Sequence, residues 1–173
     1  MKLEPVITAG DEKARAGRDQ LRHRLEAHPF CNGLNPEDIT VFAEYATATE
    51  FVAGQPIFHE GDPANCFYLI LEGSVALEAD LSPPPGDGQV IDHLGAGEVL
   101  GWSWLFPPYH WHFAARALTP TKAIFFYGTW LRERCDQDPR LGLELMKRVT
   151  GVIVRRLQTT RQRLGRALRS PPV

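Results

Sequence analysis

Short strand-like runs separated by glycine, proline and aspartate occupy the middle of this sequence, from Ala46 to about Tyr127. Seven such runs can be read there: ATEFVAG, QPIFHEG, CFYLILEG, SVALEADL, VIDHLGAG, FAARALT and KAIFFYG. Many short strands with glycine corners are typical of sandwiches, barrels and rolls. The stretch Ser82 to Gln89 is too rich in proline and glycine for regular structure and predicts an exposed hairpin loop. We therefore expect a mainly β fold, an antiparallel β-roll of the jelly-roll kind.

Helical patterns precede this β region. Asp11 is a candidate N-cap for a helix over residues 12–27, and Pro29 should end that helix. Asn35 is a good N-cap for a second, shorter helix, with Pro36 at its first position. These signals predict a helical arm over residues 1–34 and a β-roll domain over residues 35–130.

The C-terminal part, residues 131–173, predicts one long helix that begins at Asp138 and Pro139. Apolar residues recur along it at steps of three and four, as in a coiled-coil seam: Met146, Val149, Ile153, Leu157, Thr160, Leu164 and Ala167. A helix from Pro139 to Leu168 would be about 45 Å long, too long for a small roll to cover. We expect a homodimer through this helix; the alternative is a helix folded back on its own domain.

Composition is that of an ordinary globular domain, with 173 residues, 43% hydrophobic and 23% charged. No apolar run approaches the roughly 20 residues of a membrane span, and the N-terminus lacks the apolar stretch of a signal peptide. The expected location is the cytoplasm, with no membrane contact. Cys31, Cys66 and Cys135 are scattered and odd in number, which favours reduced thiols over disulfides or a zinc site.

Positive charge gathers near the C-terminus. Eight basic residues follow Glu144 without any acidic residue: Lys147, Arg148, Arg155, Arg156, Arg161, Arg163, Arg166 and Arg169. The other eleven Lys and Arg and all twenty-one Asp and Glu precede residue 147, so residues 1–146 carry about −10. Such a helix could attract nucleic acid or a membrane. Solvated coiled-coil flanks that complement the acidic body are the alternative, favoured because aromatic side chains for base stacking are absent from the helix.

The string FVAGQPIFHEGDPANCFYLILEGSVAL, Phe51 to Leu77, resembles the opening of the cyclic-nucleotide-binding domain family. The matching features are a glycine before a short apolar strand (Gly54), a Gly-Asp turn (Gly61 and Asp62), and an apolar strand that runs into Gly73. With the strands up to Tyr127 and the long terminal helix, the resemblance covers roughly residues 39–166. Within the family it resembles the bacterial regulators of the catabolite activator and the fumarate and nitrate regulator type, in which a helix-turn-helix domain follows the long dimer helix. It implies a β-roll followed by a long dimerisation helix.

In that family, backbone N–H groups of a short helical turn face the cyclic phosphate. A Glu after a glycine binds the ribose hydroxyl, and an Arg pairs with the phosphate. The matching stretch here is Gly97 to Ala117, and it departs from the pattern at both residues. Trp102 stands where the Glu is expected, and Trp111 stands where the Arg is expected. The resemblance therefore implies that cyclic nucleotide binding is possible but disfavoured, and we expect no cofactor.

Six aromatic residues replace these contacts: Trp102, Trp104, Phe106, Tyr109, Trp111 and Phe113, with His110 and His112 between them. These rings could plug the vacated pocket and leave a ligand-free scaffold. They could instead bind a different, flat or apolar ligand, or retain weak nucleotide binding. The candidate ligand-binding residues are Gly101, Trp102, Ser103, Trp104, Leu105, His110, Trp111 and His112.

Enzymatic readings find little support in the sequence. His110 and His112 could begin a cupin-like metal site, since residues two apart on a strand face the same way. The carboxylate that cupins place a few residues later is missing, and His93 is the only plausible distant ligand, so we expect no metal. Ser103 lacks the Gly-x-Ser-x-Gly turn of hydrolases, and no nucleotide-binding fingerprint is present. We expect no enzyme.

The sequence thus predicts a regulatory or sensing module with a degenerate phosphate-binding turn. It would bind a different small ligand or signal through a partner protein; the alternatives are a ligand-free dimerisation scaffold and, least favoured, a cupin-like metal enzyme. The sequence reaches Val173 without a helix pair that could enter a major groove, so we expect no sequence-specific DNA binding.

Overall fold

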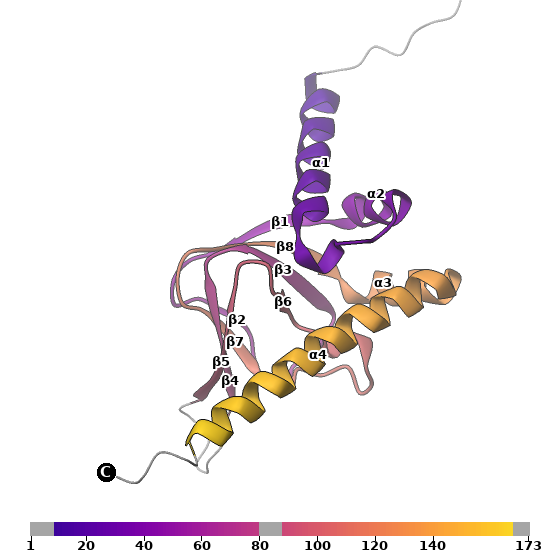
Figure 1. Ribbon diagram of the computed structural model, residues 1–173. Coiled ribbons are helices and arrows are strands. Elements are labelled where there is room, and N and C mark those ends of the chain that lie inside the picture. The colour runs from indigo at the N-terminus through magenta and orange to yellow at the C-terminus, as the bar shows by residue number, and fades with distance from the viewer. Residues whose placement is uncertain (1–8, 80–87, 168–173) are drawn as a thin grey trace, which may run out of the picture. The chain divides into compact units, whose positions relative to one another are not determined.

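The computed structural model of the protein describes residues 9–79 and 88–167, and the side chains of residues 15–79 and 88–166. Figure 1 shows the elements along the chain. In order they are α1 (Ala9–Ala27), a 3-10 turn η1 (Pro29–Cys31), α2 (Pro36–Tyr45), β1 (Thr47–Phe51), β2 (Pro56–Phe58), β3 (Cys66–Glu72), β4 (Ser74–Ala79), β5 (Gln89–Gly95), β6 (Val99–Leu100), a 3-10 turn η2 (Ser103–Leu105), β7 (Ala114–Ala117), β8 (Thr121–Tyr127), α3 (Gly128–Gln137) and α4 (Pro139–Ala167).

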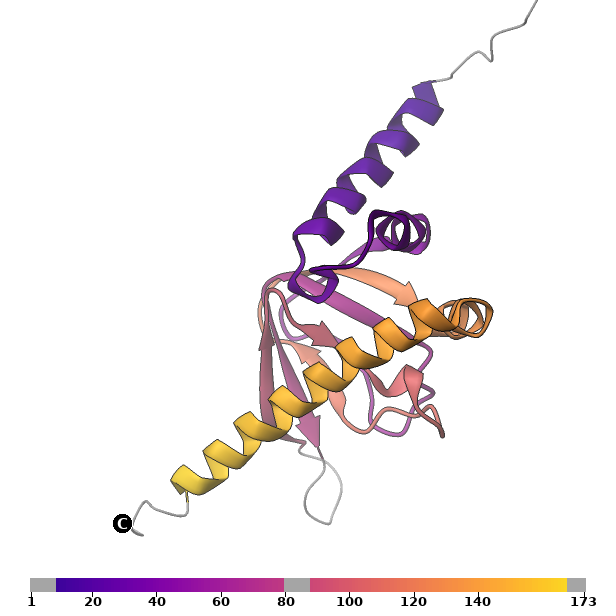
Figure 2. The ribbon, with the colours of Figure 1, turned by 45° about the vertical axis from the view of Figure 1, so that its right-hand side comes forward.

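The strands form two four-stranded antiparallel sheets among the described residues. One sheet has the order β1-β8-β3-β6 and the other has the order β2-β7-β4-β5 (Figures 1 and 2). β3 is buried along its first five residues, Cys66 to Ile70, because both of its faces are covered. The predicted antiparallel β-roll with N-terminal helices and a long C-terminal helix is confirmed.

All seven strand-like runs of the sequence become strands, from β1 to β5 and β7 to β8. Two elements, β6 and α3, were not predicted from the sequence. β6 has only two residues, which is too short to show a period, and α3 follows β8 without a loop. The predicted loop at Ser82 lies outside the described residues, while Gln89 already belongs to β5.

The first helix ends where its sequence predicts, but it begins at Ala9, so the prediction that Asp11 is its N-cap is wrong. α1 stops at Ala27, two residues before Pro29, and α1 and α2 lie side by side (Figure 1). Asn35 caps α2, because its side-chain oxygen accepts the backbone N–H of Asp38 at 2.7 Å.

His28 connects this arm to the roll. It is buried, and its Nε2 donates to the carbonyl oxygen of Ile70 in β3 at 3.2 Å, while its Nδ1 accepts the backbone N–H of Phe30 at 3.2 Å. The same Ile70 oxygen accepts the N–H of Gly97 at 2.8 Å. Both ring nitrogens of His28 are therefore used, in the neutral form of the imidazole. Burial lowers the pKa of His28, and the bond to Ile70 opposes that shift only in part.

Stability should fall as the pH drops below about 6.5, the ordinary pKa of histidine. The unfolded chain takes up a proton at His28 in that range, whereas the folded chain takes it up only at lower pH. Acid then favours the unfolded chain, by at most about 1.4 kcal/mol per pH unit. Urea unfolding between pH 7 and pH 5, compared with a His28→Asn variant that keeps a cap but cannot titrate, measures this. Parallel pH profiles for the two proteins would contradict the prediction.

The described residues form two compact units, which divide between Leu131 and Arg132. In the second unit, Asp138 caps α4 by accepting the backbone N–H of Leu141 at 3.2 Å. This hydrogen bond has the largest effect on the pKa of Asp138, which it lowers. Gly142 allows α4 to pass close to Cys135 of α3, since a Cβ at Gly142 would lie 3.2 Å from the Cβ of Cys135. Within residues 9–79 and 88–167, no helix has the length and apolar character of a membrane span.

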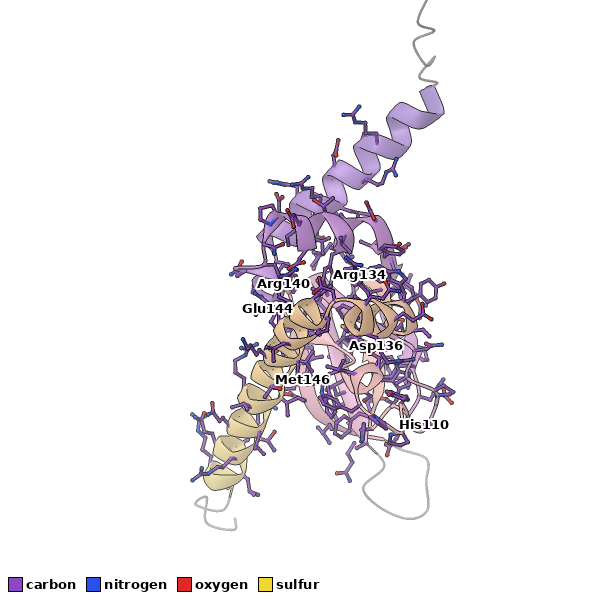
Figure 3. All side chains as sticks on the ribbon, turned by 90° about the vertical axis from the view of Figure 1, so that its right-hand side faces the viewer. His110, Arg134, Asp136, Arg140, Glu144 and Met146 are labelled. Atoms are coloured by element: carbon purple, nitrogen blue, oxygen red, sulfur yellow. The ribbon has the colours of Figure 1, made fainter. Side chains whose placement is uncertain are left out.

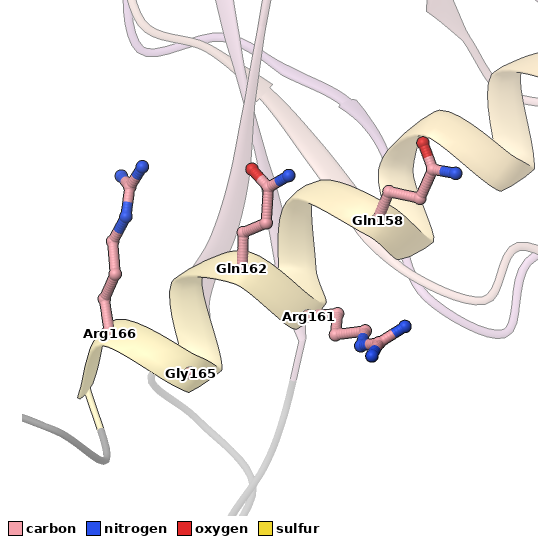
Figure 4. Close-up of a pocket in the computed structure, with 5 residues that line it drawn as sticks. All are labelled: Gln158, Arg161, Gln162, Gly165 and Arg166. Carbon is pink, nitrogen blue, oxygen red and sulfur yellow. The ribbon is translucent and has the colours of Figure 1, made fainter.

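Two rows of apolar side chains run along α4. The row Leu141, Leu145, Val149 and Val152 is buried within the chain. A second row, which includes Met146, Leu157 and Leu164, is exposed. At 3.6 residues per turn these three side chains lie within about 20° of one another around the helix axis. Gln158, Gln162 and Arg166 follow one another at steps of four, beside Arg161 and Gly165 (Figure 4).

Candidate functional site

The segment that resembles the phosphate-binding turn lies between β6 and β7. Gly101 follows β6 with a positive φ of 82°, and Trp102 leads from it into η2. The N–H of Leu105 donates to the carbonyl oxygen of Trp102 at 3.1 Å, and the N–H of Phe106 donates to that of Ser103 at 3.3 Å. A tight helical turn is thus present where the resemblance predicts one.

Backbone hydrogen bonds fix the following loop against the turn at Gly61 and Asp62. Trp111 donates its N–H to the carbonyl oxygen of Asp62 at 2.9 Å and accepts the N–H of Gly61 at 2.9 Å. Ala64 donates its N–H to the carbonyl oxygen of Tyr109 at 2.7 Å. The position of Trp111 is therefore set by the Gly-Asp turn, which comes about fifty residues earlier in the sequence.

Trp111 fills the interior of the roll. Its side chain is only 5% exposed, and its ring stacks on Phe58 with centroids 4.0 Å apart and planes 12° apart. It belongs to a core cluster with residues of both sheets: Ala64, Cys66, Tyr68, Ile70, Val75, Leu77, Leu94, Leu100, Ala115 and Ala123. A Cβ at Gly101 would lie 2.8 Å from the Trp111 ring, so the ring occupies the space that this glycine leaves.

Trp104 is also buried, in a different part of the core. Its ring stacks on Phe67 at 5.3 Å, and its Cβ approaches Gly128 so closely that a Cβ on that glycine would lie 2.7 Å away. Trp104 therefore anchors η2 between β3 and the start of α3. A side chain at Gly128, the first residue of α3, would therefore clash with Trp104.

Trp102 lies nearer the surface. It is half-buried and stacks on the exposed ring of His112, with centroids 5.3 Å apart. The Nδ1 of His112 is 3.0 Å from the hydroxyl of buried Ser103. His110 lies at the periphery of the roll, where its Nδ1 donates to the carbonyl oxygen of Pro108 at 2.8 Å (Figure 3).

The eight candidate ligand residues differ in their exposure. Four are buried and four are half-buried or exposed; the buried ones are Gly101, Ser103, Trp104 and Trp111, and the others are Trp102, Leu105, His110 and His112. Among the described residues, no group of three His, Cys, Asp or Glu is placed to hold a metal ion.

A polar pair lies inside the roll beside Trp111. The Cys66 thiol is 3.6 Å from the Tyr68 hydroxyl, and both side chains are buried. Burial raises the pKa of Cys66, with a smaller opposing effect from its bond to Tyr68, and burial also raises the pKa of Tyr68. The thiol therefore stays protonated at neutral pH, which makes it a core residue and not a nucleophile.

A groove of about 240 Å³ opens beside Phe58 on the sheet that contains β2, β7 and β4. It is lined by Pro56, Phe58, His59, Glu60, Glu78, Ala79, Gly88, Ala114, Ala115 and Arg116, and is called the Arg116 groove below. Arg116 donates through Nε to Glu78 at 3.0 Å, through Nη2 to Glu78 at 3.4 Å, and through Nη1 to the carbonyl oxygen of Gly54 at 3.2 Å. Sequence reasoning missed this groove, because only cross-strand pairing brings Glu78 to Arg116.

A family model described as the cyclic nucleotide-binding domain matches residues 48–138. The chain is 24% identical over 133 residues to a CRP-like cAMP-activated global transcriptional regulator of Mycobacterium tuberculosis, a match that covers 77% of this chain and 57% of that protein. The chain thus spans little more than half of this regulator.

Solved structures give the same picture of the fold. A candidate cyclic nucleotide-binding protein from Geobacter metallireducens matches with a TM-score of 0.71 and 29% identity, covering 79% of this chain and 97% of that one. A cyclic nucleotide-binding domain from Methylobacillus flagellatus matches with a TM-score of 0.73 and 18% identity, covering 92% of this chain and 89% of that one. At that identity the second likeness concerns the fold alone.

Proposed function

Because this chain belongs to the cyclic nucleotide-binding domain family, we propose that it is a regulatory module, not an enzyme, whose roll works without a cyclic nucleotide. The observation that carries the proposal is the buried ring of Trp111, stacked on Phe58 and lying against Gly101. Where the family resemblance expects an arginine for the phosphate, the interior of this roll already holds an indole.

An internal indole would replace the nucleotide in its structural role as well. Trp111 joins the loop that follows η2 to Phe58 through stacking and to Asp62 through its backbone, and its ring lies against Gly101 just before η2. The chain's own contacts therefore fix both ends of this segment, and regulation would come from a partner protein or from a different small molecule.

The module would signal as a homodimer through α4. The exposed row of Met146, Leu157 and Leu164 supports this part, since Leu157 is 67% exposed and Leu164 is 58% exposed. Of the remaining seam residues, Thr160 is exposed, Ile153 is half-buried and Val149 is buried within the chain, and the side chain of Ala167 lies outside the described residues. A second copy of α4 is the partner that would cover a row of this length.

Charge on the exposed row should separate the two copies. We expect the unaltered protein to sediment as a dimer at tens of micromolar, and a Leu157→Glu, Leu164→Glu double variant to sediment as a monomer, because each glutamate would be buried without a partner. The new glutamate at position 157 sits four residues before Arg161, a spacing that favours the helix itself. Sedimentation velocity with parallel circular dichroism measures both effects.

A Gln158→Glu, Gln162→Glu double variant is the matched control. It adds the same charge to the face that carries these two glutamines (Figure 4), about 100–160° around the helix axis from Leu157 and Leu164. It should remain dimeric. A monomeric unaltered protein, or a dimeric Leu157→Glu, Leu164→Glu variant, would contradict the dimer. Titration with cyclic AMP tests the other half of the proposal, and a micromolar dissociation constant would refute it.

A further inference from the structure

The Arg116 groove has an aromatic floor that is connected to the interior. Phe58 lines the groove, and one face of its ring is covered by Trp111. Ala114, Ala115 and Pro56 add apolar surface beside it. Pockets for drug-sized ligands measure about 300–1,000 Å³. A groove of about 240 Å³ therefore suits a smaller compound, of one or two rings.

The polar wall of the groove presents donors and acceptors side by side. Guanidinium carries five N–H groups, and the bonds of Arg116 within the described residues use three of them. The Glu78 carboxylate holds this guanidinium in place while keeping further lone pairs of its own, and its side chain is 15% exposed. A compound with an acceptor next to a donor on one edge would satisfy both groups at once.

Charge in the groove selects against anions. Arg116 contributes one positive charge, and Glu60 and Glu78 contribute two negative charges, so the net charge is −1 when His59 is neutral. A phosphate or a carboxylate placed against Arg116 would also lie against Glu78. The groove thus favours a neutral edge over the anionic one that a cyclic nucleotide would offer.

We infer that the Arg116 groove binds a neutral planar compound of the aromatic amide class, with its carbonyl on Arg116 and its amide N–H on Glu78. The ring of the compound stacks at Phe58. Because Phe58 also stacks on Trp111, binding changes the surroundings of the Trp111 indole. This inference rests on the proposed function, since it names the kind of small molecule to which a module without cyclic nucleotide would respond.

Benzamide is the probe, and benzoate is its matched comparator, with the same ring but two acceptors and a negative charge. Titration of the full chain, followed by amide NMR shifts and tryptophan fluorescence, should show benzamide binding at millimolar concentration and benzoate binding at least about tenfold more weakly. The shifts should centre on residues 56–60, 78–79 and 114–116. No shift with about 10 mM benzamide, or shifts confined to residues 102–112, would overturn the inference.

A Glu78→Gln variant sharpens the test. It keeps the size and an acceptor but removes the charge, so benzoate should gain at least about tenfold relative to benzamide. Glu72→Gln, which makes the same change at the surface pair with Lys122, should leave the preference unchanged. An unchanged preference in Glu78→Gln would overturn the inference. Cyclic AMP in the same titration separates the two proposals, because micromolar binding of it refutes the proposed function whatever benzamide does.

Discussion

Cyclic AMP and cyclic GMP should bind this chain only weakly, with dissociation constants of about 0.1 mM or higher. By the family resemblance, Trp102 and Trp111 stand where a glutamate would bind the ribose and an arginine would bind the phosphate. Each lost charge-assisted contact costs about 1.5 to 3 kcal/mol. Together they weaken a micromolar site by a factor of about 10² to 10⁴. The buried ring of Trp111 adds a steric obstacle. Isothermal titration calorimetry measures this affinity directly.

A Trp102→Glu, Trp111→Arg double variant should bind cyclic AMP more tightly than the unaltered protein does. Without nucleotide it should be less stable than the unaltered protein, because it places a guanidinium in an apolar cluster. With millimolar cyclic AMP its melting temperature should rise, since a ligand that binds only the folded state stabilises it. The unaltered protein serves as the control and should show a clearly smaller rise. A micromolar affinity of the unaltered protein would show that the matched positions are wrong.

Trp111→Ala should lower the free energy of unfolding by about 3 to 5 kcal/mol, the range for large aromatic residues removed from a packed core. The cavity would lie between the two sheets, where Phe58 and Gly101 lose their common neighbour. Trp102→Ala is the matched control. It also removes one indole, but from a half-buried site, and should cost only about 1 to 2 kcal/mol.

Chemical denaturation of the three proteins, followed by far-ultraviolet circular dichroism, gives these free energies without relying on the indoles as reporters. A Trp111→Ala variant that loses less than about 1 kcal/mol would mean that the ring does not pack in the core. Equal losses in the free energy of unfolding for Trp102→Ala and Trp111→Ala would contradict the conclusion that the Trp111 ring packs in the core while the Trp102 ring lies near the surface.

The fold was readable from the sequence because its signals are local. Gly54, Gly61, Gly73 and Gly101 all adopt positive φ, and each marks a corner between two apolar runs. The Asn35 cap and the start of α4 at Pro139 were likewise encoded within a few residues. α3 was missed because its sequence, GTWLRERCDQ, is largely polar and begins at a glycine directly after a strand.

Which tryptophans of the aromatic cluster are buried could not be predicted from local sequence signals. Trp102, Trp104 and Trp111 have similar sequence surroundings, yet Trp104 and Trp111 are buried while Trp102 is only half-buried. What separates them is long-range. Trp111 stacks on Phe58 and donates its backbone N–H to Asp62. Trp104 packs against Gly128, where a side chain would clash with it. The pairing of Glu78 with Arg116 is also a product of strand register, which no short motif specifies.

The contact between Trp111 and Gly101 has an evolutionary consequence. An ancestor with an arginine at position 111 could accept the indole in one step, since the ring packs on Phe58 and against Gly101 inside the roll. The reverse path is harder. Arginine at position 111 without glutamate at position 102 buries a charge and still lacks a ribose contact, so the single intermediate would be selected against. Lineages that acquire this tryptophan should therefore seldom return to nucleotide sensing, and should be free to drift at every other position that once touched the nucleotide.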